Sequence, residues 1–161
     1  MTDKDSALES TLVLIKPDAV GRGLAGTILA RLEAKGLLIR GVRSFVFSDE
    51  LVHEHYADLV DRPFFPGLAE FMTSGMTIAV WVSGVDVVNV VRLLIGATNA
   101  RAAAPGTVRG DLAASAQRNL IHASDSLDTA RAELARFFPD GPTIPVDEAI
   151  VAAVYSPGEV A

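Results

Sequence analysis

The chain has 161 residues, a formal net charge of −6 and a pI near 5.0, and this acidic balance argues against a general nucleic-acid or anionic-membrane binder. Half of the residues are hydrophobic and 21% are charged, which is the composition of a globular domain. The chain lacks cysteine, which excludes disulfide bonds, thiolate metal sites and a cysteine nucleophile. Its first ten residues are polar and unlike a signal peptide, and no apolar run approaches the ~20 residues of a membrane span. We therefore expect a cytoplasmic protein.

The N-terminal part of the chain predicts a leader, a strand and a helix. Residues 1–10 are polar enough to form a loose leader. The β-branched run at 11–15 predicts a buried strand, which Pro17 ends. Residues 24–35 place their apolar side chains on one helical face, and Gly36 is a suitable C-terminal cap.

Residues 37–75 predict a second strand and two short helices. The strand covers 37–47, with Gly41 as the candidate for a bulge. The next helix begins at a Ser-Asp-Glu cap and covers 48–59. After a break at a proline, residues 64–74 predict another helix that ends at Gly75.

The middle of the chain predicts a third strand, a helix and a long connection. Residues 76–83 alternate between two faces, as a strand does. Residues 85–95 are rich in valine, but their apolar positions follow the helical period, so we predict a helix. Residues 96–111 form an irregular connection, and connections of this length are often functional.

The last strand and helix meet at a histidine. Leu120 and Ile121 predict the end of a buried strand, and His122 follows at once. Residues 124–126 predict the cap of a helix with an apolar stripe, which consists of Leu127, Ala130, Leu134, Phe137 and Phe138. The tail at 139–161 contains an apolar run, so we expect it to pack on the domain or on a neighbouring subunit.

This order of elements predicts one domain over residues 1–161 with a β-α-β-β-α-β core, the ferredoxin-like pattern. The expected α+β fold has a four-stranded antiparallel sheet with helices on one face, plus a long loop and the C-terminal tail.

Residues 21–26 match the glycine pattern of a dinucleotide-binding turn, G-x-G-x-x-G, but the match is a false lead. That turn needs its first glycine directly after the strand, and here residues 16–20 intervene. The sequence also lacks a G-x-x-x-x-G-K-[ST] loop. A bound nucleotide would therefore be held by side chains.

His122 is a candidate nucleophile on local grounds. A strand-to-helix junction holds it beside the backbone N–H groups of a helix start, which favour anions. A neutral imidazole has a lone pair that is free to attack. The alternative is a hydrogen-bonded structural histidine. His53 and His55 are poor candidates for a shared metal ion, because residues two apart on a helix point to different sides.

Four segments, in this order and spacing, resemble the nucleoside diphosphate kinase family. They are Lys16-Pro17-Asp18-Ala19-Val20-Gly21-Arg22-Gly23, Asp61-Arg62-Pro63-Phe64-Phe65, Pro105-Gly106-Thr107-Val108-Arg109-Gly110-Asp111 and Asn119-Leu120-Ile121-His122-Ala123-Ser124-Asp125-Ser126. The resemblance covers roughly residues 10–138.

The resemblance implies a ping-pong transfer of the γ-phosphate from a nucleoside triphosphate, typically ATP, to a nucleoside diphosphate. The catalytic histidine of the family falls on His122. The carboxylate that orients it falls on Glu133, and Ser124 resembles its hydrogen-bonding neighbour. Without the motif, Glu133 could equally be a solvated helix charge paired with Arg131 or Arg136.

The resemblance also implies the substrate contacts. Lys16, Arg92 and Arg109 match phosphate and sugar contacts, Thr98 matches a phosphate donor and Asn119 a sugar contact. Taken singly, the two arginines could be plain surface residues.

The remaining contacts concern the nucleoside and the metal. Tyr56 matches a residue near the ribose and the histidine, and Phe64 matches the aromatic residue that stacks on the base. Phe65 is better placed in the core. The expected cofactor is Mg2+ carried by the nucleotide phosphates, with no direct protein ligand.

Three alanines depart from the family pattern. Ala123 stands where glycine is usual after the histidine, Ala116 where a larger apolar residue often flanks the base, and Ala100 where a proline is common. None of these removes a reacting group.

The resemblance implies self-association, as a homohexamer or alternatively a homotetramer, and no specific nucleic-acid or membrane partner. The alternative function is a catalytically silent nucleotide-binding or regulatory homologue of the same fold.

Overall fold

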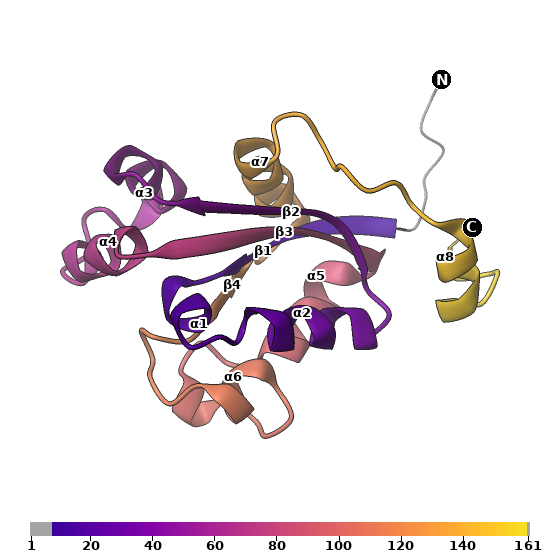
Figure 1. The fold of residues 1–161 in the computed structure, drawn as a ribbon, viewed down its shortest axis with the longest axis horizontal. Coiled ribbons are helices and arrows are strands. Elements are labelled where there is room, and N and C mark those ends of the chain that lie inside the picture. The colour runs from indigo at the N-terminus through magenta and orange to yellow at the C-terminus, as the bar shows by residue number, and fades with distance from the viewer. Residues whose placement is uncertain (1–7, 161) are drawn as a thin grey trace.

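The computed structural model describes residues 8–160. Within that range the chain forms a four-stranded antiparallel sheet in the order β2-β3-β1-β4 (Figure 1). The strands are β1 (Leu8–Ile15), β2 (Leu38–Val46), β3 (Met76–Val85) and β4 (Ile121–Ala123). This sheet confirms the predicted α+β, ferredoxin-like fold. Of the leader predicted at 1–10, residues 1–7 lie outside the described residues, and the prediction is wrong for 8–10, which belong to β1 because they pair with the end of β3.

Helices occupy most of the connections between the strands. They are α1 (Pro17–Gly21), α2 (Ala25–Ala34), α3 (Asp49–His55), α4 (Phe65–Thr73), α5 (Val87–Ile95), α6 (Val108–Leu112), α7 (Leu127–Phe137) and α8 (Glu148–Val154), with 3-10 turns η1 (Ala57–Leu59) and η2 (Ala100–Ala102). None of the helices in the described part of the chain is long and apolar enough to cross a bilayer.

Strand β3 separates two hydrophobic cores, one on each face of the sheet, whereas the sequence predicted helices on one face only. Val80 and Val82 point to the face that α2 and α5 cover, where they contact Ile28 and Val91. The valine-rich α5 is helical because its buried positions recur at the helical period against this face.

The opposite face of the sheet is covered too. Ala79 of β3 faces a second core that includes Leu134 and Phe137 of α7 and Met72 of α4. In Figure 1 helix α7 lies on one side of the sheet and α2 and α5 on the other. The helices α3, α4 and α7 therefore add a layer beyond the ferredoxin-like core.

Several boundaries differ from the sequence predictions. His122 lies inside β4, where it is the register partner of Leu14, and does not follow the strand. The predicted loop at 96–111 contains the start of α6, which Thr107 caps by accepting a hydrogen bond from Gly110 N. Leu127 was expected in the apolar stripe of α7 but is 36% exposed, because it lies at the first turn of the helix.

The C-terminal tail packs on its own domain. Ile144 N donates to Arg40 O (2.8 Å), and Arg40 Nε donates to Ile144 O (2.6 Å). Farther along, Val85 N donates to the Tyr155 hydroxyl (3.2 Å) beside α8. The tail thus crosses β2, and α8 lies at the end of the sheet away from α3 and α4 (Figure 1).

The difference in burial between a leucine of α7 and a leucine of α5 predicts different effects of truncating each to alanine. We expect Leu134→Ala, at a side chain that is 4% exposed, to lower the free energy of unfolding by about 2–5 kcal/mol through lost transfer energy and a cavity. The matched control is Leu93→Ala on α5, which is 77% exposed and should change stability by less than about 0.5 kcal/mol. Urea unfolding measures both, and equal losses would contradict the packing of α7.

Candidate active site

A strained turn precedes the strand that carries His122. Leu120 has φ 72°, in the left-handed region that a leucine rarely adopts, at a cost of about 1–3 kcal/mol. Two hydrogen bonds hold it there, because Leu120 N donates to Asp18 Oδ2 (3.1 Å) and Lys16 N donates to Leu120 O (2.9 Å). The turn thereby ties the start of β4 to the end of β1.

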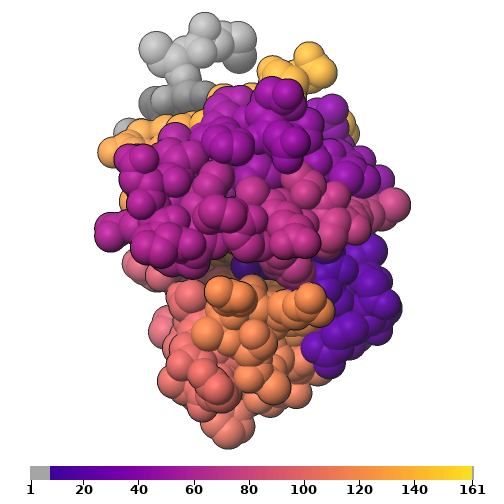
Figure 2. Space-filling view, turned by 90° about the vertical axis from the view of Figure 1, so that its left-hand side faces the viewer, coloured from indigo at the N-terminus to yellow at the C-terminus, as the bar shows by residue number. Residues whose placement is uncertain are grey.

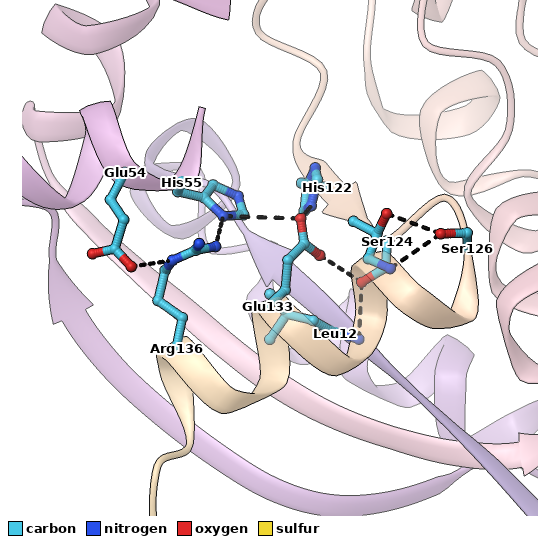
Figure 3. A network of polar contacts seen from close by, with 9 residues as sticks. Leu12, Glu54, His55, His122, Ser124, Ser126, Glu133 and Arg136 are labelled. Atoms are coloured by element: carbon cyan, nitrogen blue, oxygen red, sulfur yellow. Dashed lines mark hydrogen bonds and ion pairs between the residues drawn. The ribbon is translucent and has the colours of Figure 1, made fainter. Parts of the chain in front are cut away.

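His122 and Glu133 form the central pair of the site. The Nε2 atom of His122 lies 3.0 Å from Glu133 Oε1 (Figure 3). An ionised carboxylate can only accept, so Nε2 carries the hydrogen, and the lone pair of the neutral imidazole is on Nδ1. The His122 side chain is 24% exposed, so this ring lies at the surface of a cavity.

Ser124 holds the other oxygen of the same carboxylate. Its hydroxyl donates to Glu133 Oε2 (2.5 Å) and accepts from Leu12 N (3.3 Å). Burial would raise the pKa of Glu133, but hydrogen bonds from His122 and Ser124 hold that pKa below its ordinary value. The carboxylate is therefore ionised and fixed at both oxygens, and the alternative pairing with Arg131 or Arg136 does not occur.

The cavity beside His122 has a volume of about 920 Å³. Figure 2 looks onto this side of the molecule, with the purple segments of α3 and α4 above and the orange segment that precedes β4 below. Nine of the ten predicted site residues line it: Lys16, Tyr56, Phe64, Arg92, Thr98, Arg109, Asn119, His122 and Glu133. Ser124 is fully buried behind Glu133.

Lys16 is a buried cation held by an amide. Its Nζ donates to Asn119 Oδ1 (2.8 Å), and the side-chain amide of Asn119 donates in turn to Thr98 O (2.9 Å) and Ala116 O (3.1 Å). Burial, followed by the charge of Arg109, lowers the pKa of Lys16 to about 8. The amide of Asn119 therefore positions Lys16 as well as lining the cavity.

Arg109 is anchored by backbone carbonyls. Its Nε donates to Asn119 O (3.2 Å), Nη1 to Gly96 O (2.9 Å) and Nη2 to Ile121 O (2.6 Å). Burial, followed by the charge of Arg92, lowers the pKa of Arg109 to about 10. A guanidinium has five N–H donors, so those left over can serve an anion in the cavity.

The far end of the cavity is less polar. Phe64 is 49% exposed at the start of α4, and Leu68 lies one helical turn later on the same wall. Ala116 contributes to the lining as well. The Tyr56 hydroxyl is buried without a hydrogen-bond partner, and burial raises the pKa of Tyr56, so this group remains an O–H donor.

His55 is the functional candidate that sequence reasoning missed. Its ring lies 5.0 Å from the ring of His122, and it lines the cavity. His53 instead contacts Phe65 and the backbone of Asp49, so the two helix histidines do point apart. The proximity of His55 to His122 has no local sequence signal, since it depends on how α3 packs.

The ligand atoms of His55, His122 and Glu133 lie within 4.8 Å of one another, close enough to suggest a metal ion. However, Arg136 Nη1 lies 3.5 Å from His55 Nδ1. A guanidinium at a ligand atom opposes a cation, and a hard ion such as Mg2+ prefers oxygen to nitrogen. These three residues are therefore a poor set of ligands for Mg2+.

Comparison with known proteins identifies a family. A family model described as "Nucleoside diphosphate kinase" matches residues 9–142. Nucleoside diphosphate kinase 1 of Oryza sativa subsp. indica is 47% identical over 134 residues, which cover 83% of this chain and 90% of the relative. A nucleoside diphosphate kinase of Herpetosiphon aurantiacus is 50% identical over 131 residues, covering 81% of this chain and 88% of the relative.

A solved structure shows the same arrangement of the chain. The halophilic nucleoside diphosphate kinase of Halobacterium salinarum, solved in complex with CDP, superposes with a TM-score of 0.88 at 47% identity. The match covers 92% of this chain and 99% of that one.

The environment of Lys16 predicts an unusual titration. We expect its ammonium group to lose its proton near pH 8, about two units below an ordinary lysine, because burial disfavours the charged form. NMR of ¹³Cε-labelled lysine measures this directly, and Lys16→Arg assigns the signal by its disappearance. A midpoint above pH 10 would contradict the described burial.

Proposed function

The chain belongs to the nucleoside diphosphate kinase family, and we propose that its His122 carries the transferred phosphate. The protein is a phosphotransferase that moves phosphate between nucleotides. In the proposed cycle, His122 takes the γ-phosphate of a nucleoside triphosphate, typically ATP, and passes it to a different nucleoside diphosphate.

One observation supports this role above the others. Glu133 accepts the hydrogen on Nε2 of His122, so the nucleophilic lone pair is on Nδ1 beside a cavity with several cations. Orientation and charge neutralisation are what phosphoryl transfer needs most.

Each half of the reaction exchanges one bond for another. The Nδ1 lone pair of His122 attacks the γ-phosphorus, and the bond to the β,γ-bridging oxygen breaks, with its electron pair leaving on the diphosphate. The phosphorylated ring then has positive charge, which the carboxylate of Glu133 stabilises. A terminal oxygen of the second diphosphate attacks the same phosphorus and returns the electron pair to Nδ1.

The cations of the cavity would hold the polyphosphate. Lys16, Arg92 and Arg109 are proposed to contact the phosphates and Thr98 to donate a further hydrogen bond, each charge-assisted bond contributing about 1.5–3 kcal/mol. Arg92 and Thr98 are exposed, which leaves their polar groups available to a ligand.

The less polar end would hold the nucleoside. Phe64 is proposed to stack on the base, Tyr56 to lie near the ribose, and Asn119 to contact the sugar. Stacking on one exposed ring accepts any base, which suits transfer among many nucleotides.

The family uses a divalent cation, and we propose Mg2+ carried by the phosphates. Among the described residues the one cluster with metal-ligand spacing contains two histidines and a carboxylate, a poor donor set for a hard ion, so nucleotide oxygens would bind it. When bound, Mg2+ neutralises phosphate charge.

Self-association as a homohexamer, with a homotetramer as the alternative, is also proposed. Strand β2 lies at the edge of the sheet and exposes Val42 (49%) and Val46 (57%). An apolar edge strand favours pairing with another chain. We further propose a cytoplasmic location, in keeping with an acidic chain whose chemistry needs no disulfide. No observation favours a catalytically silent homologue.

The proposed intermediate predicts a labelled protein. Incubation with γ-³²P-ATP and Mg2+ should label the chain with a phosphate that survives base and is lost in acid, as expected for phosphohistidine. The chain has 3 histidines, so His53→Ala is a matched control that should label like the wild type. His122→Ala should not label or transfer phosphate to any diphosphate, and label on that variant would refute the assignment.

The edge strand predicts an assembly that can be broken. Light scattering should give a mass six times that of the 17.0 kDa chain, and Val46→Lys should shift it toward smaller species by placing a charge on the exposed edge. A wild-type chain that elutes as a monomer would contradict the proposed assembly.

A further inference from the structure

A row of polar contacts extends behind the proposed catalytic pair, from α7 to α3 (Figure 3). Arg136 Nε donates to Glu54 Oε1 (2.7 Å), and Arg136 Nη1 lies 3.5 Å from His55 Nδ1. His55 Nδ1 in turn lies 3.9 Å from Glu133 Oε1, the same oxygen that accepts from His122. The proposed function assigns no role to Arg136 or Glu54.

The contact with Arg136 determines the tautomer of the His55 ring. A guanidinium can only donate, so Nδ1 of His55 accepts and the hydrogen of the neutral ring is on Nε2. That Nε2 atom is buried without a hydrogen-bond partner. In this tautomer His55 offers Glu133 no N–H group, although it lies 3.9 Å away.

The surroundings of His55 keep it neutral. Burial first, then His122, and to a smaller extent Arg136 and Lys16, lower the pKa of His55 to about 3 against the opposing effect of Glu133. The titratable and charged groups around the ring are therefore Glu133 and Arg136 from α7, His122 from β4, Lys16 after β1, and Tyr56 and Glu54 from the α3 segment.

Removing the guanidinium would create a competitor for the carboxylate. The Nδ1 atom of His55 could then bear a hydrogen and turn it toward Glu133 Oε1. His122 would lose part of the interaction that fixes its tautomer and stabilises the charge of the phosphorylated ring.

We infer that Arg136 is a positioning residue that keeps Nδ1 of His55 from bonding to Glu133. The Oε1 atom of Glu133 is thereby left to His122. Glu54 holds the guanidinium in place, and the planar fork of an arginine can reach both partners at once, which a lysine cannot. This inference rests on the proposed role of His122.

The first experiment compares Arg136→Met with Arg131→Met. Arg131 lies on the same helix but pairs with Asp128 at the surface, with side chains that are 77% and 94% exposed, so it is a matched control. The single-turnover rate of phosphorylation by Mg-ATP and the nucleotide Kd are measured from pH 5.5 to 8.5. We expect Arg136→Met to lose about tenfold in rate at every pH, because the competing N–H group belongs to the neutral His55 ring, with Kd unchanged.

The second readout is the tautomer itself. Long-range ¹H–¹⁵N spectra of the histidine rings should show His55 with its hydrogen on Nε2 in the wild type and in Arg131→Met. In Arg136→Met, Nδ1 of His55 should bear the hydrogen of the neutral ring. A structural role for Arg136 would not produce this change.

The third arm removes the competitor. His55 packs against the rings of Phe47 and Phe137, so His55→Phe suits the site. Added to Arg136→Met, it should abolish the loss of rate. The inference is overturned if Arg136→Met matches Arg131→Met in rate and spectrum, or if the double variant keeps the loss of rate.

A failure of the proposed function would give a different result. The His122→Ala variant would then be labelled by γ-³²P-ATP, while the His55 spectra would still show the tautomers expected above. If Arg136→Met does not fold, Glu54→Gln tests the same contact at a side chain that is 61% exposed. It should change the rate profile and the His55 spectrum in the same direction but less, and no change in either would overturn the inference.

Discussion

The carboxylate of Glu133 is the group on which the site depends, because each of its oxygens has one task. Oε1 fixes the tautomer of His122, and Oε2 is held by Ser124. Glu133 comes from α7 and His122 from β4, so their 3.0 Å contact requires α7 to lie across the sheet. The second core, to which Leu134 and Phe137 belong, provides that packing. Catalytic geometry is thus a consequence of how the added helical layer covers the sheet.

The need to bring side chains from different elements together also explains why the backbone before β4 is strained. The left-handed turn at Leu120 redirects the chain so that Asn119 meets Lys16 while His122 enters the sheet beside Leu14. Its cost of about 1–3 kcal/mol is offset by hydrogen bonds to the turn from both ends of the Lys16–Asp18 segment. Distortion at one residue therefore brings Lys16 and His122 to the same cavity.

Local signals in the sequence predicted much of this arrangement, and contacts between distant segments account for the rest. The alternation of β3 and the cap at Ser126 are properties of a few neighbouring residues, and both occur as predicted. The motif order predicted which residues line the cavity. The contact of Arg136 with His55 has no such signal, because the two residues lie on different helices and 81 positions apart in the sequence. Nor does any local pattern show that Arg109 donates to three backbone carbonyls.

Lys16 and Arg109 connect function with stability. Both are buried, and the pKa of each is lowered because burial disfavours its charge. Asp18, a carboxylate that acts on Lys16, also accepts from Leu120 N. The cavity therefore contains positive charges that are poorly solvated in the free protein, and this lowers the stability of the fold. A polyphosphate bound as proposed would compensate that charge, so part of its binding energy would relieve an unfavourable feature of the free protein, and binding would stabilise the fold by mass action.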